Sequence, residues 1–330
     1  MERWRGLEQL PGSWGRCVVT IGVFDGVHRG HRALINRAVE LARNRGLPCV
    51  VLTFDPHPAE VVRPGSHPAQ LTTLRRKAEL VEQLGVDVFC VLPFTLELSR
   101  LPADEFVHEI LVEHLHVDTV VVGENFTFGA GAHGNVDLLQ RLGQRFGFVT
   151  EDAELVNARV PRDDPGPAEP NGDDATITFS STYIRSCIDA GDVAAAQAAL
   201  GRPHRVEGIV VRGDGRGHEL GYPTANLSLP RYAAIPADGV YACQFTPLSA
   251  AHGEPLAAAV SVGSNPTFSG RERRVEAYVL DVDEDFYGQH VALDFVARLR
   301  DMERFSSSAE LVERMDDDVQ RTRELVSSEW

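Results

Sequence analysis

Residues 17–54 constrain the fold of this chain most, because they predict a strand, a helix and a second strand in direct succession. Cys17–Ile21 is a short apolar run of the kind that forms a buried strand. The following segment stops at Gly46, and its apolar residues recur at helical spacing, at Leu34, Ala38, Leu41 and Ala42. A second apolar run extends from Cys49 to Phe54. This succession predicts a parallel βαβ crossover.

The turn between the first strand and the helix, GVFDGVHRGH from Gly22 to His31, indicates a ligand site, because α/β sheets bind ligands at the carboxyl ends of their strands. The turn carries three glycines that allow the backbone to approach a ligand closely, Gly22, Gly26 and Gly30. His28 and His31 begin the helix, where free N–H groups and the helix dipole favour phosphate. The alternative is a solvated helix cap. The preceding strand, the glycines and Asp25 favour the phosphate site.

The length of 330 residues is sufficient for two domains. No apolar run approaches the ~20 residues that a membrane helix needs, and the first 16 residues lack the apolar core of a signal peptide. We therefore expect a cytoplasmic protein that has no membrane partner. The five cysteines are scattered and form no C-x-x-C pair. We expect them to be buried core residues in a reducing compartment rather than a disulfide framework or a zinc site.

The net charge of −16 argues against a nucleic-acid partner. Of the 32 basic residues, all but Lys77 are arginines, a skew typical of a genome with high GC content. No G-x-x-x-x-G-K-[ST] motif is present. Phosphate chemistry in this chain must therefore depend on backbone N–H groups, arginine, histidine or a metal ion.

The first half of the chain alternates predicted strands and helices up to about residue 150, the pattern of a doubly wound α/β domain. The further strands are Val86–Leu92 and Thr119–Val122, and the further helices are Leu74–Leu84 and Ala103–His116. Residues 161–175 are rich in Pro, Gly and Asp and predict an exposed, mobile loop. A helical stretch follows from about Thr182 to Leu200, with a break near Gly191.

The second half has the rhythm of a small antiparallel barrel, in which strands alternate with turn-forming residues. The predicted strands are His204–Val211, Gly239–Thr246, Leu256–Val262, Arg274–Val282 and His290–Arg298. An acidic amphipathic helix closes the chain from Ser307 to Val326, with Ser307 or Ser308 as its cap and Glu310 in its first turn.

Two further motifs follow predicted strands in the first half. TFDPHP, from Thr53 to Pro58, places Pro56 and His57 beside the first turn, although paired prolines also simply rigidify a strand end. GENFTFG, from Gly123 to Gly129, offers the amide of Asn125 between two aromatic rings that could stack on a planar ligand, Phe126 and Phe128. The alternative for this motif is a turn that faces the core, which we favour for Phe126.

A third motif, SSTYIR from Ser180 to Arg185, begins a helix. Ser181 or Thr182 can cap that helix, which would suffice to explain one hydroxyl. Three hydroxyls followed by Arg185 at a helix start also form a small phosphate clamp, since backbone N–H groups, hydroxyls and a guanidinium would converge on one anion.

The second half contains the glycine-rich segment GDGRGHELGYPTANL, whose N–H groups could surround phosphates. Thr224 and Asn226 lie two residues apart in an extended segment, so both oxygens face one side and could ligate one Mg²⁺. Glu276 shares a strand face with Tyr278 and Leu280. A carboxylate among large apolar residues is costly unless it has a partner or a function.

The motifs together resemble those of the bacterial bifunctional riboflavin kinase/FAD synthetase family over about residues 15–325. The resemblance depends on their order: GVFDGVHRGH, TFDPHP, GENFTFG, SSTYIR, LGRPHRVEGIVVRGDGRGHELGYPTANL, DGVYAC, NPTF and VEAYVLD. His204 stands where the family usually has an aromatic residue, His218 where arginine is common, and the 161–175 loop is longer than usual. The H-x-G-H pair is similar to that of nucleotidyltransferases, which transfer AMP or CMP without a covalent enzyme intermediate.

The resemblance implies a doubly wound nucleotidyltransferase-like α/β domain and a six-stranded antiparallel riboflavin kinase barrel with a terminal helix. We expect an FMN adenylyltransferase domain at 1–188, a helical linker at 189–203 and a riboflavin kinase domain at 204–330. The substrates would be ATP, riboflavin and FMN, with Mg²⁺ as the metal. A flavin-binding protein that has lost catalysis, or an adenylyltransferase with an inert barrel, would have the same fold. Competent residues at every site position argue against both.

The resemblance also assigns roles to individual residues. For adenylyl transfer, it implies that His28, His31 and Arg185 are catalytic and that ATP contacts Gly22, Phe24, Asp25, Gly26, Gly30, Ser180, Ser181 and Thr182. It implies that the flavin of this step lies against Pro56, His57, Asn125 and Phe128. For the kinase step, it implies that ATP contacts Gly213, Gly215, Gly217, Gly221, Pro223 and Thr224. Mg²⁺ would be held by Thr224 and Asn226, with Glu276 as the general base.

Overall fold

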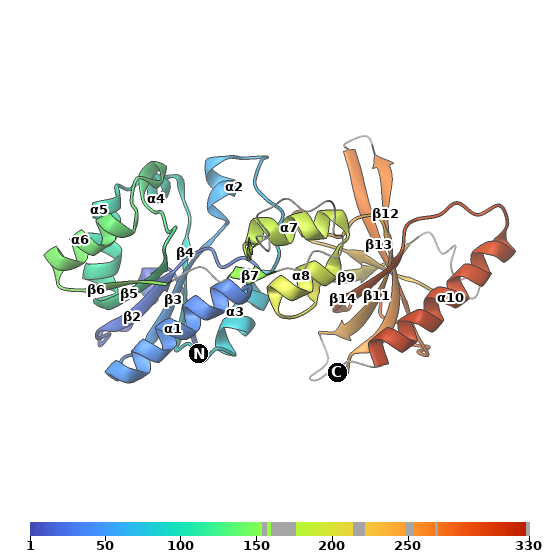
Figure 1. The fold of residues 1–330 in the computed structure, drawn as a ribbon, viewed down its shortest axis with the longest axis horizontal. Helices are drawn as coiled ribbons and strands as arrows, with labels where there is room; N and C mark the ends of the chain where they lie inside the picture. The colour runs from blue at the N-terminus through green and yellow to red at the C-terminus, as the bar shows by residue number, and fades with distance from the viewer. Residues whose placement is uncertain (154–156, 160–175, 214–221, 249–253, 268–269, 328–330) are drawn as a thin grey trace, which may run out of the picture. The chain divides into compact units, whose positions relative to one another are not determined.

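A computed structural model describes residues 1–153, 157–159, 176–213, 222–248, 254–267 and 270–327 (Figure 1). The expected mobile loop at 161–175 lies outside the described residues. The chain forms two compact units. The first comprises Met1–Pro68 and Thr73–Ser180, and the second comprises Ala69–Thr72 together with the chain from Ser181 onward.

The first unit contains a six-stranded parallel sheet in the order β1-β4-β3-β2-β5-β6. Its strands are β1 (Glu2–Arg5), β2 (Cys17–Ile21), β3 (Cys49–Asp55), β4 (Val88–Pro93), β5 (Val117–Gly123) and β6 (Val149–Ala153). Its α-helices are α1 (Arg29–Arg45), α2 (Pro58–Val62), α3 (Leu74–Glu82), α4 (Leu96–Arg100), α5 (Ala103–Phe106) and α6 (Val136–Phe146). A π-helical segment, Val107–His114, continues α5, and β7 (Asn157–Arg159) pairs with β8 (Thr176–Thr178).

Helices cover both faces of this sheet, as expected for a doubly wound domain (Figure 1). Residues of α1 and α3 share one hydrophobic cluster with one face of the strands, and residues of α5, the π-helical segment and α6 share a second cluster with the other face. The strands therefore have apolar side chains on both faces, which is why every residue of Cys17–Ile21 is buried and all but Thr20 are apolar. Gly46 ends α1 in the left-handed conformation with φ 64°, which confirms the predicted stop.

The strand order determines where ligands can bind. β2 lies between β3 and β5. After β2 the chain forms β3 and β4 on one side of it, and later β5 and β6 on the other side. The switch point of the topology therefore lies between β2 and β5, and ligands bind in α/β sheets outside the carboxyl ends of the strands at such a point. The turns that follow β2, β3 and β5 share this edge of the sheet.

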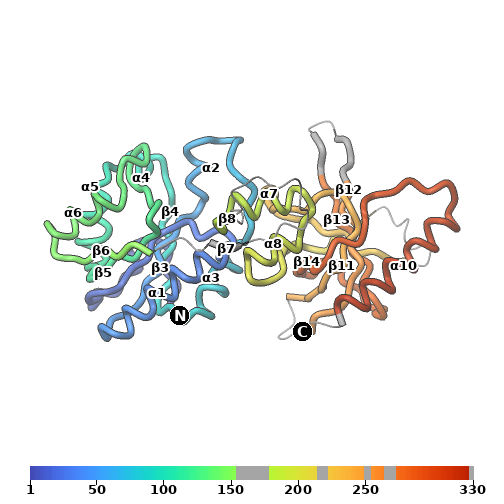
Figure 2. The backbone as a smooth tube through the Cα atoms, viewed as in Figure 1, coloured from blue at the N-terminus to red at the C-terminus, as the bar shows by residue number. Residues whose placement is uncertain are grey.

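The second unit contains a closed six-stranded barrel in the order β10-β13-β12-β11-β14-β9, in which every pair is antiparallel. Its strands are β9 (His204–Val211), β10 (Ala225–Ser228), β11 (Gly239–Pro247), β12 (Leu256–Thr267), β13 (Gly270–Val279) and β14 (His290–Arg300). The helices of this unit include α7 (Ser181–Ala190), α8 (Val193–Leu200) and α10 (Ser308–Ser327), the last beside the barrel strands in Figure 2. Apolar side chains of all six strands fill the barrel.

Most of these elements were predicted from the sequence, but five strands, β1, β6, β7, β8 and β10, and the helices α2, α4 and α6 were not. β7 and β8 have only three residues each. β1 and β10 are four residues long, and only one side chain of each is buried, so neither carries an apolar run. β6 has no buried side chain. The Ser307 hydroxyl accepts a hydrogen bond from the Glu310 N–H at 3.2 Å, which confirms the predicted cap of the last helix. All five cysteines are buried free thiols, as predicted.

Candidate functional site

The turn after β2 has an unusual backbone. Phe24 and Val27 adopt left-handed conformations with φ 48° and 39°, and Gly26 has φ 83°. Such angles are rare for bulky or β-branched residues and persist only where packing holds the chain in place. Phe24 and Val27 are both 1% exposed, within the core that lies under α1. A Cβ at Gly22 would lie 3.1 Å from the Phe24 ring, so a side chain there would require that buried ring to shift by a few tenths of an ångström.

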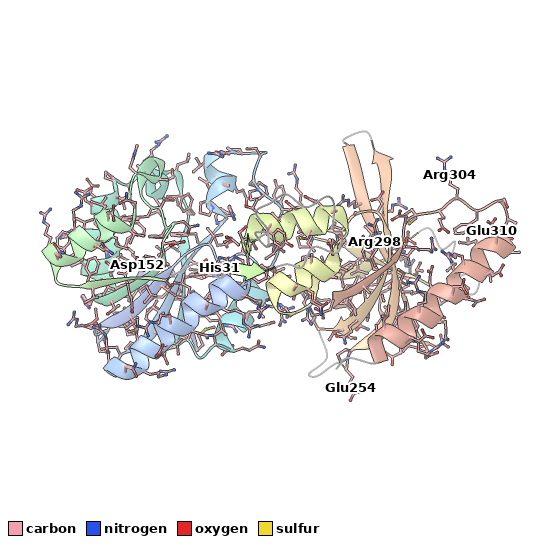
Figure 3. The ribbon with its side chains drawn as sticks, in the orientation of Figure 1. His31, Asp152, Glu254, Arg298, Arg304 and Glu310 are labelled. Carbon is pink, nitrogen blue, oxygen red and sulfur yellow. The ribbon has the colours of Figure 1, made fainter. Side chains whose placement is uncertain are left out.

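The two histidines of the turn form one stacked pair. Their ring centroids lie 3.6 Å apart at 24°, and the His31 N–H donates to Nδ1 of His28 at 3.3 Å. Figure 3 labels His31 at the start of α1. Phe24 packs edge-on against His31 at 5.3 Å. Because Nδ1 of His28 accepts this bond, a neutral His28 carries its proton on Nε2. The cap that we considered as an alternative is present, but His28 is buried rather than solvated, and the bond fixes both rings at the helix N-terminus.

Lys77, which the sequence did not place in any site, donates a hydrogen bond to the backbone of this turn. Nζ of Lys77 donates to the Val23 carbonyl oxygen at 2.6 Å, and the Thr53 hydroxyl donates to the same oxygen at 3.1 Å. The signal in the sequence was that Lys77 is the only lysine. A contact over a separation of 54 residues could not be read from spacing alone.

The motifs after β3 and β5 lie at the same edge of the sheet. His57 caps α2, since its Nδ1 accepts from the Ala59 N–H at 3.1 Å, and Pro56 before it is exposed. Asn125 is exposed in the turn after β5. Phe128 is only 8% exposed and stacks on the half-buried Phe126 at 5.4 Å. Contact of Pro56, His57, Asn125 and Phe128 with a flavin stays a prediction. Phe126, for which we favoured a turn that faces the core, is the less buried of the two phenylalanines.

The last residues of the first unit, Phe179 and Ser180, lie near the start of α1. The Arg29 guanidinium lies 5.8 Å from the centre of the Phe179 ring, and the Phe179 carbonyl oxygen lies 3.5 Å from the position of a Cβ on Gly30. Ser180, which follows directly, is thereby brought near the first turn of α1. This arrangement joins the start of the SSTYIR motif to the histidine turn.

The remaining residues of that motif belong to the second unit. Ser181 and Thr182 begin α7, and Nε of Arg185 donates to the Ala69 carbonyl oxygen at 2.6 Å. Arg185 therefore holds the Ala69–Thr72 segment within that unit. Participation of Ser181, Thr182 and Arg185 in the histidine site stays a prediction.

In the barrel, the predicted base and the predicted metal ligand are cross-strand partners. Asn226 on β10 lies directly opposite Glu276 on β13. Their neighbours Leu227, Val275 and Ala277 fill the barrel interior, so Asn226 and Glu276 face outward. Side chains of directly opposite residues are neighbours, with Cβ atoms about 4.5–5.5 Å apart. Two residues separated by 50 positions thus form one polar site.

The start of the glycine-rich segment packs against this pair. A Cβ at Gly213 would overlap the amide of Asn226, so the backbone after β9 lies directly on that side chain. Thr224, two residues before Asn226, is half-buried, and Pro223 is exposed. The other proposed phosphate-binding glycines, Gly215, Gly217 and Gly221, lie outside the described residues, as does His218.

Aromatic residues and α10 border the same outer face. Tyr222 packs edge-on against Tyr278 at 5.0 Å, and its hydroxyl donates to Asp316 of α10. That hydrogen bond raises the pKa of Tyr222 to about 12, so the phenol stays protonated. Tyr278 is half-buried on the face of Glu276, as predicted, whereas Leu280 lies beyond the end of β13. His204, at the other end of the barrel wall, is a buried side chain whose Nε2 lies 2.7 Å from the Ala234 carbonyl oxygen.

Comparison with known proteins gives two family matches. Residues 10–160 match the model for FAD synthetase, and residues 200–326 match the model for riboflavin kinase. The first match contains the histidine turn and the second contains Asn226 and Glu276, whereas residues 180–185 lie in neither. Among the described residues, no helix is long and apolar enough to cross a membrane.

Relatives match the chain over nearly its whole length. The bifunctional riboflavin kinase/FMN adenylyltransferase of Escherichia coli K12 is 36% identical over 94% of this chain and 92% of its own, and that of Pseudomonas fluorescens is 36% identical over 99% and 98%. A crystal structure described as a macrolide-efflux protein from Streptococcus pneumoniae superposes with a TM-score of 0.82 at 30% identity, over 98% of this chain and 99% of its own. With both family models and this extent of identity, the chain belongs to the family of bifunctional riboflavin kinase/FMN adenylyltransferases.

Proposed function

We propose that this enzyme phosphorylates riboflavin to FMN in its barrel and joins FMN to AMP from ATP in its α/β unit, which gives FAD and pyrophosphate. The two family models and the bifunctional relatives support both activities. We assign residues 1–188 to adenylyl transfer, 204–330 to the kinase and 189–203 to a helical linker. The partners are the small molecules ATP, riboflavin and FMN. The buried, unpaired cysteines fit a reducing compartment, and we place the enzyme in the cytoplasm.

The observation that carries the kinase assignment is the pairing of Asn226 with Glu276 on the outer face of the barrel. Transfer of the γ-phosphoryl group to the 5′-hydroxyl of riboflavin forms an O–P bond and releases ADP. The hydroxyl must lose its proton as it attacks, and the Glu276 carboxylate accepts that proton. The cross-strand pairing places this base beside the residue proposed to hold the metal–nucleotide complex.

The residues around Asn226 fit a magnesium ion. Mg²⁺ prefers oxygen ligands and in phosphoryl-transfer sites takes one or two from protein and others from substrate phosphates. The hydroxyl of Thr224 and the amide oxygen of Asn226 are such ligands, and the Gly213 backbone packs closely against the Asn226 amide. Bound Mg²⁺ would supply positive charge that offsets the phosphate oxygens, which no lysine of this unit can do because Lys77 belongs to the other unit.

For adenylyl transfer, a phosphate oxygen of FMN attacks the α-phosphorus of ATP and pyrophosphate leaves. No covalent intermediate with the enzyme is needed, so positioning and charge stabilisation dominate catalysis. We assign that role to His28 and His31, whose stacked rings stand at the N-terminus of α1, where the helix dipole also favours negative charge. Ser180 and the start of α7 would add hydroxyl donors and Arg185.

Two separate assays on the purified protein test this function. One follows conversion of riboflavin to FMN with Mg²⁺ and ATP, and the other follows conversion of FMN to FAD. Both should proceed. Flavin binding without either product would instead identify a binding protein that has lost catalysis, and FAD formation alone would identify an adenylyltransferase with an inert barrel.

A further inference from the structure

Lys77 is the only lysine among the 32 basic residues of this chain, and it is almost fully buried. Its side chain is 6% exposed on α3, in the first unit. A chain that uses arginine at every other basic position keeps a lysine here, which indicates that the site requires a compact ammonium group. Arginine has a planar fork of five donors that needs several acceptors, whereas an ammonium can serve one carbonyl in a narrow space.

The Lys77 ammonium lies under the strained part of the histidine turn. It donates a hydrogen bond to the carbonyl oxygen of Val23 at 2.6 Å. Val23 immediately precedes Phe24, which has φ 48°. The Thr53 hydroxyl at 3.1 Å is the second donor to this oxygen. Strained backbone persists only where surrounding groups determine it, and a charged donor is about twice as strong as a neutral one. The lysine is therefore a main support for the shape of the turn.

The charges of two carboxylates at this edge of the sheet also act on the ammonium. Burial lowers the pKa of Lys77, and the charges of Asp25 and Asp55 act in the opposite direction. Asp25 is buried within the turn, and Asp55 is exposed at the end of β3. Without a compensating cation, two negative charges at the carboxyl edge of the sheet would repel a polyphosphate. Lys77 is placed to supply that compensation from within the protein.

We propose that Lys77 is a positioning residue for adenylyl transfer: it holds the Gly22–His28 turn in its phosphate-binding shape and offsets the charge of Asp25 and Asp55. The inference rests on the adenylyl transfer proposed above for this unit. Lys77 affects the reaction indirectly, through the shape of the turn, because its Nζ donates to the Val23 carbonyl oxygen. Its loss should therefore affect the use of ATP rather than the binding of the flavin.

The test uses the full-length enzyme with Lys77→Met, which keeps a long apolar stem and removes the charge and the donor. FAD formation is measured while ATP and FMN are varied separately, at a temperature well below the melting point of each protein. We expect kcat/KM for ATP to fall by about 10- to 100-fold, the effect of misplacing groups around a reacting centre by about an ångström. KM for FMN should stay within two-fold of the unsubstituted enzyme.

The matched control is Arg75→Met, which removes a cation from the exposed face of the same helix, where Arg75 pairs with Glu79. It should leave FAD formation unchanged. Riboflavin phosphorylation, measured on the same preparations, should be normal in both variants. If the unsubstituted protein makes no FAD, the proposed function fails; if it makes FAD and Lys77→Met does so equally well, this inference alone fails.

A purely structural lysine would give a different result. Lys77→Met would then melt at a lower temperature but use ATP normally below that temperature, and this outcome overturns the proposal. An equal rise in KM for both ATP and FMN overturns it as well. If the Met variant does not fold, Lys77→Gln, whose amide can still donate to Val23 but carries no charge, is judged by the same criteria.

Discussion

Replacing Glu276 by Gln should nearly abolish riboflavin phosphorylation while FAD formation from FMN continues. The substitution keeps the size of the side chain and removes its basicity. Loss of a general base slows a reaction by about 10²- to 10⁴-fold, which is about 2.7–5.4 kcal/mol of transition-state stabilisation at 1.36 kcal/mol per factor of ten. Glu276 is half-buried on the outer face of the barrel, so the free energy of unfolding should change by no more than about 0.5 kcal/mol.

The assay separates FMN and FAD by chromatography after incubation with riboflavin or with FMN. A matched control is Ser261→Ala. Glu276 has two cross-strand neighbours, Asn226 on β10 and Ser261 on β12. The Ser261 hydroxyl donates a hydrogen bond to the Met302 sulfur at 3.8 Å. The control should form FMN at a rate within about two-fold of the unsubstituted enzyme, since surface substitutions are nearly neutral. FMN formation by Glu276→Gln at a similar rate would refute the assignment of the base.

Three further substitutions test the adenylyltransferase site. His31→Ala should slow FAD formation by about 10²-fold or more, as loss of one transition-state donor does, with FMN formation unchanged; equal loss of both activities in a rate assay would indicate misfolding instead. Arg185→Ala should raise KM for ATP or lower kcat in the FAD assay alone, and thermal melting should be recorded beside it because Arg185 also holds the Ala69 carbonyl oxygen. A structure with bound ATP that placed Arg185 far from the phosphates would contradict this role. Asn125→Ala should weaken FMN binding, measured by quenching of flavin fluorescence, and leave ATP binding nearly intact; because Asn125 is exposed, stability should not change, and unchanged FMN affinity would reject the placement.

Signals that act over a few residues were predictable from the sequence. The stop of α1 at Gly46 and the Ser307 cap of α10 each depend on one residue and its immediate neighbours. The alternation of apolar runs and helical spacing likewise identified the parallel sheet of the first unit. β10 escaped prediction because a four-residue strand with one buried side chain, Leu227, has too little pattern to detect.

The candidate functional residues of each site were identified by residue type, from carboxylates, histidines and glycines in ordered motifs. The residues that they contact in the fold could not be identified in this way. Local spacing places Thr224 and Asn226 on one side of an extended segment, but it contains no information about which strand lies beside them. That Glu276 is the neighbour of Asn226 depends on the register of β10 and β13.

The sequence by itself determined the order of the longer elements, the ends of α1 and α10 that depend on Gly46 and Ser307, and the residue types available for phosphate chemistry. These depend on backbone preferences and side-chain patterns within one or two turns. The tertiary structure alone decided which distant residues meet. Packing of Leu227, Val275 and Ala277 inside the barrel sets the register that brings Asn226 to Glu276. Packing of α3 against the sheet likewise carries Lys77 to the Val23 carbonyl oxygen. In both cases the polar contact results from the burial of apolar side chains at other positions of the same elements. The sequence around the polar residue therefore could not predict it.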